Sequence, residues 1–254
     1  MTELPDYRED PEAYEVEERS RPDEMAMLNR AGGVASQLLD RITDASVLDL
    51  CCGTGLSLEH LVNHPNVSYI VGVDICQPYL DFAAHRFQNA RTRPFYILGD
   101  AVEAPLPRDT WDIVMLASAY HHIEDERKLQ FLSRVHELLG ENGYAVVAEN
   151  LLPEYTEGDK ESYATAVRLF YREVLKEAKL NNPTLPEYVE GLIQRVAQYG
   201  FDGDYEYKTS LPIFLRYLQA AGLETVSQER VWPHSGPLSE TSGGNYVMLL
   251  RPAV

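Results

Sequence analysis

The sequence predicts an α/β fold in which helices cover both faces of a doubly wound, mostly parallel sheet. Short apolar runs alternate with helical patterns from about residue 45 to residue 150, which is typical of parallel strands joined by helices. The next segment, 151–209, carries helical patterns but no strand signal. At 254 residues the chain is long enough for one such domain with an added helical cap.

The charge of the chain argues against a nucleic-acid partner. Acidic side chains number 40 and basic ones 22, so the net charge is −18, and no basic run offsets it. Such a surface repels phosphate backbones. The first twenty residues lack an apolar signal stretch, and no run approaches 18 consecutive apolar residues. We therefore expect a cytoplasmic protein with no membrane partner, and the oligomeric state is left open.

Residues 1–44 are expected to form an acidic segment followed by a lid helix. Residues 1–25 are the most charged part of the chain, and residues 24–42 carry apolar side chains at helical spacing. The charged part has two interpretations, a frayed tail or a segment that folds over a ligand site. In the second interpretation, one or more of four side chains reach the ligand: Tyr7, Tyr14, Arg19 or Arg21.

The most informative motif lies at the start of the core. Val47–Leu50 reads as a short buried strand that breaks into a glycine turn, with Gly53 and Gly55, and then enters a helix. Asp74 ends a second apolar run about 20 residues further on. A Rossmann-type fold holds an adenosine ribose in this way, because the carboxylate accepts hydrogen bonds from the ribose hydroxyls. The glycines let the backbone approach the ligand.

The glycine pattern distinguishes between adenosine ligands. A dinucleotide site needs a third glycine where this chain has Leu58, and no Lys or Arg lies between Asp49 and Asp81 to bind a pyrophosphate. The motif resembles the acid-x-Gly-x-Gly-x-Gly motif of the class I S-adenosylmethionine (SAM)-dependent methyltransferases. Asp49 is its acid, and Cys51 replaces its first glycine. The resemblance implies SAM as the cofactor.

The rest of the chain resembles the same family over residues 45–150 and 210–251. Four later segments match its strands and turns in order: Phe95–Ala101, Trp111–Ser118, Leu138–Val147 and Leu218–Val226. The usual proline before strand five is missing. The resemblance implies a Rossmann-like sheet of seven strands, which residues 210–254 complete with a helix and a C-terminal antiparallel hairpin. Family members often close the site with their N-terminal helix.

The resemblance also implies which residues bind the cofactor. Asp74 is expected to bind the ribose, Ile75 to pack on the adenine ring, and Asp100 to meet the adenine amino group. The alternative is that Asp49 and Asp74 serve turn chemistry alone and that Asp100 is a plain loop acid. The predicted set lies at strand ends and in the N-terminal segment: Tyr14, Arg21, Asp49, Cys51, Gly53, Gly55, Asp74, Ile75, Asp100, Ala101 and Ser118.

Residues 151–209 read as a helical cap over the substrate pocket. Apolar side chains from Tyr163 to Ala178 fall on one helix face, Asp159 is placed to cap that helix, and a second helix is expected from about Pro186 to Gly200. The cap is rich in tyrosine: Tyr155, Tyr163, Tyr171, Tyr188, Tyr199, Tyr205 and Tyr207. Most are expected to pack normally, and one or two to line the cavity, where aromatic faces stabilise a sulfonium.

Candidate catalytic residues follow the fourth and fifth strands, because ligands of open α/β sheets bind at the carboxyl ends of the strands. His121 is the predicted general base or acceptor-orienting group, accompanied by Tyr120 and Asn150. The alternative is that His121 and His122 only support their loop. No metal site is expected at this pair, because adjacent side chains point apart and no third ligand is evident.

The three cysteines, Cys51, Cys52 and Cys76, lack C-x-x-C spacing and are odd in number. They are interpreted as small buried thiols in a reducing compartment rather than as disulfides or metal ligands.

Three functions are compatible with these patterns. The leading hypothesis is a SAM-dependent methyltransferase that acts on a small organic acceptor, and a role in secondary metabolism rests on the resemblance alone. In the second, SAM is itself the substrate of an intramolecular cyclase or lyase that releases methylthioadenosine. The third is a non-catalytic SAM-binding module. The sequence names neither the acceptor nor the accepting atom, O, N, C or S.

Overall fold

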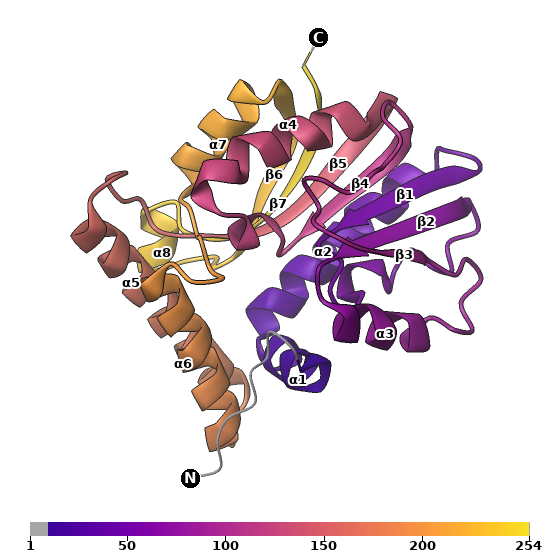
Figure 1. The fold of residues 1–254 in the computed structure, drawn as a ribbon. Coiled ribbons are helices and arrows are strands. Elements are labelled where there is room, and N and C mark those ends of the chain that lie inside the picture. The colour runs from indigo at the N-terminus through magenta and orange to yellow at the C-terminus, as the bar shows by residue number, and fades with distance from the viewer. Residues whose placement is uncertain (1–9, 254) are drawn as a thin grey trace.

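The computed structural model describes residues 10–253, so Tyr7 lies outside the described residues. Its centre is a seven-stranded sheet in the order β3-β2-β1-β4-β5-β7-β6, as Figure 1 shows. β1 to β5 are parallel, and β7 runs antiparallel to both β5 and β6. The strands are β1 (Ala45–Leu50), β2 (Val67–Asp74), β3 (Phe95–Leu98), β4 (Trp111–Ala117), β5 (Leu139–Leu151), β6 (Leu223–Trp232) and β7 (Gly244–Pro252). The predicted fold class is confirmed.

Helices cover both faces of the sheet, and the side chains of each strand alternate between the two resulting cores. On β1, Val47 belongs to the core under α2 (Pro22–Leu39), whereas Leu48 belongs to the core under α4 (Lys128–Leu138) and α7 (Leu211–Ala220). Parallel strands buried on both faces read as continuous apolar runs. This is why the central strands were recognisable in the sequence.

The N-terminal segment is helical from residue 11 onward, so the frayed-tail interpretation is wrong for the described part. α1 (Pro11–Ser20) begins after Asp10, whose side chain accepts hydrogen bonds from the backbone N–H groups of Glu12 and Ala13 at 3.0 Å. The expected helix over 24–42 begins and ends earlier, as α2. Pro22 occupies its first position, where a missing N–H costs nothing.

The expectation of a helix after the glycine turn is wrong. Leu56–Leu58 forms a single 3₁₀ turn, η1, and hydrogen-bonded turns continue to Asn63. The apolar side chains Leu58 and Leu61 are nevertheless fully buried. His64 precedes Pro65, and a residue before proline disfavours the helical conformation. The short segment therefore returns to β2 before a full helix can form.

The cap consists of two helices that pack against the N-terminal helices rather than on the sheet alone (Figure 1). α5 (Lys160–Asn181) is capped by Asp159 as predicted, because that carboxylate accepts hydrogen bonds from two backbone N–H groups of the first turn. α6 (Glu187–Asp202) agrees with the second expected helix. The remaining helices are short or lie at the sheet ends: α3 (Gln77–Arg86), η2 (Tyr120–His122), η3 (Asp125–Arg127) and α8 (Pro237–Glu240).

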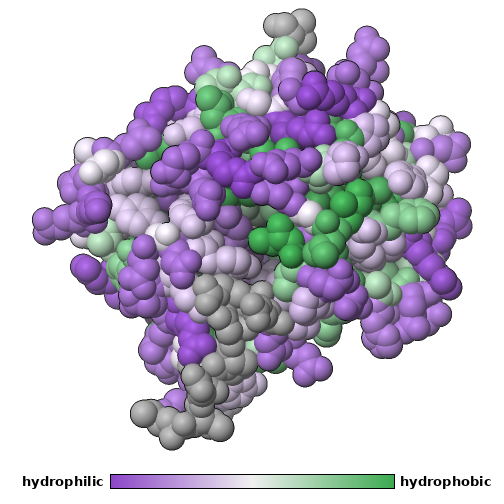
Figure 2. Space-filling view, viewed as in Figure 1, coloured by the Kyte–Doolittle hydropathy of each residue, from purple (hydrophilic) through white to green (hydrophobic). Residues whose placement is uncertain are grey.

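The surface agrees with the acidic composition. Figure 2 shows one face of the molecule as mostly hydrophilic, with a smaller apolar area near its centre. Within residues 10–253, none of the helices combines the length and apolar composition that crossing a bilayer requires.

Truncation of the cap core should destabilise the protein. Phe170 on α5 is fully buried, and its ring lies edge-on to Tyr171 and Trp232. Phe170→Ala should lower the free energy of unfolding by about 3–5 kcal/mol, because a cavity replaces the ring. Leu180→Ala on the same helix is the control, since Leu180 is 68% exposed and should change the urea midpoint little. Equal effects of the two substitutions would contradict this account of the cap.

Candidate functional site

A cavity of about 300 Å³ lies at the carboxyl ends of the parallel strands. This edge of an open α/β sheet is where such folds bind ligands. Eight of the eleven residues predicted to bind a cofactor line it: Tyr14, Cys51, Gly53, Asp74, Ile75, Asp100, Ala101 and Ser118. The other three, Arg21, Asp49 and Gly55, do not.

Left-handed backbone shapes the cavity wall. Gly53 has φ +51° and Gly55 has φ +83°, and a Cβ on Gly55 would lie 2.6 Å from the ring of Phe87. Only glycine fits there, so Gly55 builds the turn without lining the cavity. Cys51, Ser118 and Tyr205 also adopt positive φ. Such backbone strain in non-glycine residues clusters at functional sites, and all three of these residues line the cavity.

Asp74 joins the glycine turn to the end of β2. Its Oδ2 accepts a hydrogen bond from the Gly53 backbone N–H at 2.8 Å, and its Oδ1 accepts one from the Cys76 N–H at 2.9 Å. Burial, the largest effect, raises the pKa of Asp74 above its ordinary value. Each carboxylate oxygen has a second lone pair. The side chain can therefore still accept hydrogen bonds from a ligand in the cavity.

Asp49 is buried beneath the turn. Its Oδ2 accepts a hydrogen bond from the Ser57 hydroxyl at 2.5 Å, and its Oδ1 has no hydrogen-bond partner among the described residues. Burial raises the pKa of Asp49 to about 7. A buried acceptor without a partner costs free energy, so this oxygen fits a role toward a bound polar group or an ordered water.

Asp100 and Ile75 lie on the cavity wall in contrasting environments. Burial alone would raise the pKa of Asp100, but the Arg127 guanidinium, with N···O 2.7 Å, and the Val102 N–H hold it below its ordinary value. Both oxygens of Asp100 already accept hydrogen bonds, so Arg127 shares the position predicted for the adenine amino group. Ile75 is 70% exposed beside it, as expected for an apolar side chain that packs on a ligand ring.

Arg21 lies outside the cavity, in a buried cluster of carboxylates. Its guanidinium pairs with Glu24 at 3.0 Å and Glu17 at 3.4 Å, and it lies within 3.8 Å of Glu18 and 3.7 Å of Asp23. The expectation that Arg21 reaches the ligand is not met, because these acids hold the side chain within the N-terminal helices.

Glu24 of α2 connects this cluster to the strand ends. Its carboxylate accepts hydrogen bonds from the Ser118 hydroxyl after β4 and from the Asn150 amide, at 2.8 Å, in β5. Asn150 is therefore occupied by α2 and does not line the 300 Å³ cavity. Tyr120 does not line it either, since its ring is 1% exposed and packs 4.7 Å from that of Phe214. Asn150 borders a small adjoining cavity together with His121, so its predicted role stays open, whereas Tyr120 borders neither cavity.

His121 and His122 lie side by side in η2, with ring centroids 4.2 Å apart. Nδ1 of His121 forms a hydrogen bond with Glu149, and Nδ1 of His122 with the Tyr205 carbonyl at 3.0 Å. Burial lowers the pKa of His121 well below its ordinary value and raises that of Glu149 to about 7. His121 is therefore a neutral imidazole at neutral pH.

The two rings also meet a third side chain. Ligand atoms of His121, His122 and Glu206 all lie within 4.8 Å of one another. The expectation that the adjacent histidines point apart without a third ligand is wrong. The compact 3₁₀ turn brings the two rings together, and the chain after α6 returns Glu206 to them. Sequence separation concealed this third partner.

Several residues that line the cavity were not among those predicted to bind the cofactor. Tyr79 on α3 and the cap residues Tyr205 and Tyr207 line the cavity, together with His122 and Arg127. The tyrosine-rich cap was a signal for two of them, but nothing in the local pattern separated Tyr205 and Tyr207 from the cap tyrosines that only pack.

Comparisons with known proteins agree with this geometry. Residues 47–143 match a family model described as a methyltransferase domain. An uncharacterized methyltransferase of Mycobacterium tuberculosis is 37% identical over 112 residues, which cover 44% of this chain and 54% of the relative. A demethylmenaquinone methyltransferase of Lactiplantibacillus plantarum is 28% identical over 117 residues, covering 44% of this chain and 48% of that relative. The chain thus spans about half the length of the curated relatives it matches.

A solved structure resembles most of the chain. The 1,6-didemethyltoxoflavin-N1-methyltransferase of Burkholderia thailandensis, with its substrate and S-adenosylhomocysteine bound, superposes with a TM-score of 0.57 at 18% identity. The match covers 91% of this chain and 80% of that one. At this identity the likeness establishes the fold.

The match over residues 47–143 agrees with the class I, SAM-dependent methyltransferase family that the sequence motifs resemble. SAM is the cofactor of this class, as expected. The residues present fit it. The cavity combines a turn that only glycine can build, a partly buried carboxylate whose oxygens can accept further hydrogen bonds, and an exposed isoleucine.

Loss of the Asp74 carboxylate should abolish cofactor binding. Asp74→Ala removes the acceptor for the ribose and leaves the Gly53 N–H without its partner, so SAM affinity should fall at least about 100-fold. Isothermal titration calorimetry is the measurement. Asp81→Ala is the control, because Asp81 is exposed on α3 and its carboxylate accepts a hydrogen bond from Gln77 in its own helix. Unchanged affinity of the Asp74 variant would contradict the assignment.

The buried Asp49 should make stability depend on pH. Its pKa of about 7 in the folded state exceeds the value of about 3.9 in an unfolded chain. Its contribution is therefore full below about pH 4 and is lost as the pH rises through 7. Asp49→Asn, whose amide oxygen can still accept from Ser57, should raise the cofactor-free Tm at pH 8 by at least about 2 °C and less at pH 5. A pH-independent difference in differential scanning calorimetry would refute this.

Proposed function

We propose that this chain transfers a methyl group from SAM to a small organic acceptor. One observation carries the proposal. At the cavity wall, the Asp74 carboxylate is fixed against a left-handed glycine turn, with Ile75 exposed beside it. This combination serves a nucleoside.

The cavity residues have distinct roles in this proposal. When bound, SAM supplies a methyl group activated by a positively charged sulfur. Asp74 accepts hydrogen bonds from the ribose, and the Gly53 backbone allows close approach. Ile75 packs on the adenine. Asp100 stays a candidate for the adenine amino group, in competition with its ion pair to Arg127.

Aromatic side chains close the cavity. The ring centroids of Tyr14 on α1 and Tyr79 on α3 lie 5.2 Å apart, and Tyr205 of the cap packs 4.5 Å from His122. These rings exclude water from the reaction, and their faces stabilise a nearby cation. The lid interpretation of the N-terminal segment therefore supports the proposal through Tyr14 rather than through Arg21.

The acceptor side is proposed to lie at His121 and His122. A second, very small cavity shares Tyr14, Ser118 and His122 with the large one, and His121 borders only the small one. Nδ1 of each ring is bound to an oxygen, which leaves Nε2 for other partners. Without a bound metal ion, these Nε2 atoms can orient an acceptor or take its proton.

The net charge of the chain limits the class of acceptor, whereas the names of the relatives do not identify it. A net charge of −18 disfavours nucleic acid. The relatives act on different molecules, as the names demethylmenaquinone and 1,6-didemethyltoxoflavin show. We propose that the acceptor is a small organic molecule with a nucleophilic O, N, C or S atom. We also propose that the enzyme is cytoplasmic.

Product analysis tests the proposal directly. The protein is incubated with SAM alone and with a panel of small phenols, amines and thiols, and the products are identified by mass spectrometry. S-adenosylhomocysteine should form only when an acceptor is present. Methylthioadenosine formed from SAM alone would instead show a cyclase or lyase, and tight SAM binding without any turnover would favour a binding module.

Substitution of His121 should slow catalysis without weakening cofactor binding. His121→Ala should lower kcat at least about 100-fold, the usual contribution of a positioned proton acceptor. SAM affinity should stay within about twofold, because His121 does not line the large cavity. His85→Ala, at an exposed position on α3, is the matched control. A large loss of SAM affinity together with activity would assign His121 to the fold instead.

A further inference from the structure

Three side chains from two distant segments converge beside the cavity. His121 and His122 come from η2, and Glu206 follows α6 in the cap. The distance from His121 Nε2 to Glu206 Oε2 is 3.9 Å, and ligand atoms of all three residues lie within 4.8 Å of one another. Small side-chain movements would bring them to the separations found around one bound cation.

Both imidazoles are held in the orientation that metal ligands adopt. The Tyr205 carbonyl can only accept a hydrogen bond, so Nδ1 of His122 must donate the proton at 3.0 Å. Its Nε2 then carries the lone pair. His121 has the same arrangement, with Glu149 as the oxygen partner of Nδ1. A carboxylate or a carbonyl behind each histidine is the usual support of a metal-binding imidazole.

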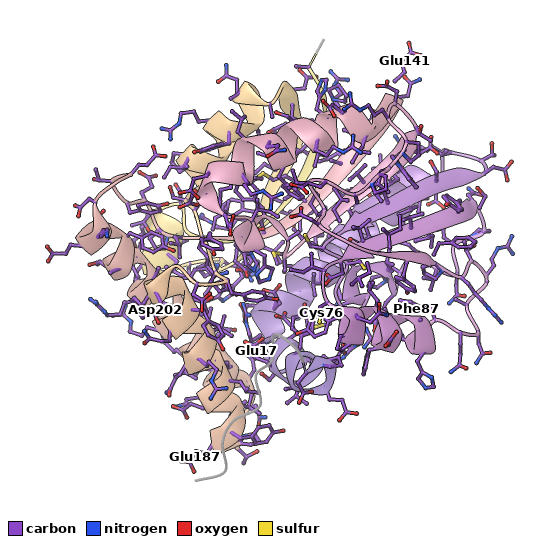
Figure 3. All side chains as sticks on the ribbon, in the orientation of Figure 1. Glu17, Cys76, Phe87, Glu141, Glu187 and Asp202 are labelled. Carbon is purple, nitrogen blue, oxygen red and sulfur yellow. The ribbon has the colours of Figure 1, made fainter. Side chains whose placement is uncertain are left out.

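The space between these groups suits a single ion. The small cavity that His121, His122 and Glu206 border has a volume of about 10 Å³, enough for one ion or one water. Glu17 and Glu18 of α1 border it as well, and each has one buried oxygen without a hydrogen-bond partner among residues 10–253. In Figure 3 Glu17 lies beside α6 of the cap. Arg21, which lies within 3.8 Å of both carboxylates, borders the same cavity.

We propose that His121, His122 and Glu206 form a binding site for one divalent transition-metal cation, with Zn²⁺ as the probe. Two imidazoles favour a first-row transition metal over Mg²⁺ or Ca²⁺, which prefer oxygen ligands. Three protein ligands leave coordination positions open. His122 and Ser118 border both cavities, so an oxygen or nitrogen of the acceptor can occupy an open position. Only this binding of the acceptor to the metal ion rests on the proposed function.

Two cationic side chains compete for this space, because Lys208 and Arg21 both border the small cavity. Nζ of Lys208 lies 2.9 Å from Glu206 Oε2. An ammonium beside the site repels a metal and occupies one carboxylate oxygen. The site should therefore bind Zn²⁺ less tightly than its ligand set alone would allow. Lys208→Met, which keeps the buried length of the side chain, should tighten Zn²⁺ binding.

The test measures metal binding without reference to activity. Untagged protein is freed of metal with a chelator and titrated with Zn²⁺ by calorimetry, and the bound metal is counted after equilibrium dialysis. One Zn²⁺ per chain is expected. His122→Ala and the conservative Glu206→Gln should each weaken binding at least about tenfold. His85→Ala should bind Zn²⁺ like the unchanged protein, because His85 is exposed on α3. Circular dichroism verifies that each variant is folded.

The outcomes separate this inference from the proposed function. SAM affinity is measured on the same samples. Stoichiometric Zn²⁺ binding that is lost in both variants supports the site even if no methyl transfer is found. Equal Zn²⁺ affinity in the unchanged protein and in a folded Glu206→Gln variant would overturn it. So would the absence of stoichiometric binding, which would mean that the cavity holds only a water.

Discussion

The site depends on the hydrogen bonds that the buried carboxylate of Glu24 accepts. This carboxylate joins α2 to Ser118 after β4, to Asn150 in β5, and to Arg21 between α1 and α2. Asp23 adds a hydrogen bond from Asn245 of β7. Buried charges are stable only with such partners. The N-terminal helices are therefore docked on the strand ends, and Tyr14 is carried to the cavity mouth.

This docking divides the strand ends into two environments. The large cavity lies over β1, β2 and β4 and is shaped by backbone, because the glycine turn and three strained residues set its wall. The small cavity lies over η2 and is shaped by charge, because two histidines, buried carboxylates from α1 and the cap, and the cations Arg21 and Lys208 surround it. The first is suited to bind a nucleoside, and the second to hold a cation or to move a proton. Ser118, Tyr14 and His122 belong to both.

Local patterns predicted the sheet well and the site only in part. Each parallel strand and the N-terminal cap of α5 depend on a short stretch of sequence. The buried strands and the capping residue Asp159 could therefore be recognised directly. The helix predicted after Gly55 is a single 3₁₀ turn instead. The proline and the short connection prevent a full helix despite the helical spacing of the apolar residues. Arg21, Tyr120 and Asn150 do not line the large cavity, because neighbouring side chains hold them elsewhere.

The sequence by itself determined the sheet, the glycine turn with its carboxylate, and the family, because each rests on residues close together in the chain whose spacing carries the chemistry. Only the tertiary structure decided which charged side chains meet. Glu206 lies 84 residues after His122 and Glu149 lies 28 residues after His121, and no local spacing encodes such a meeting. Burial then determines what these groups do, since desolvation changes which of them carry charge.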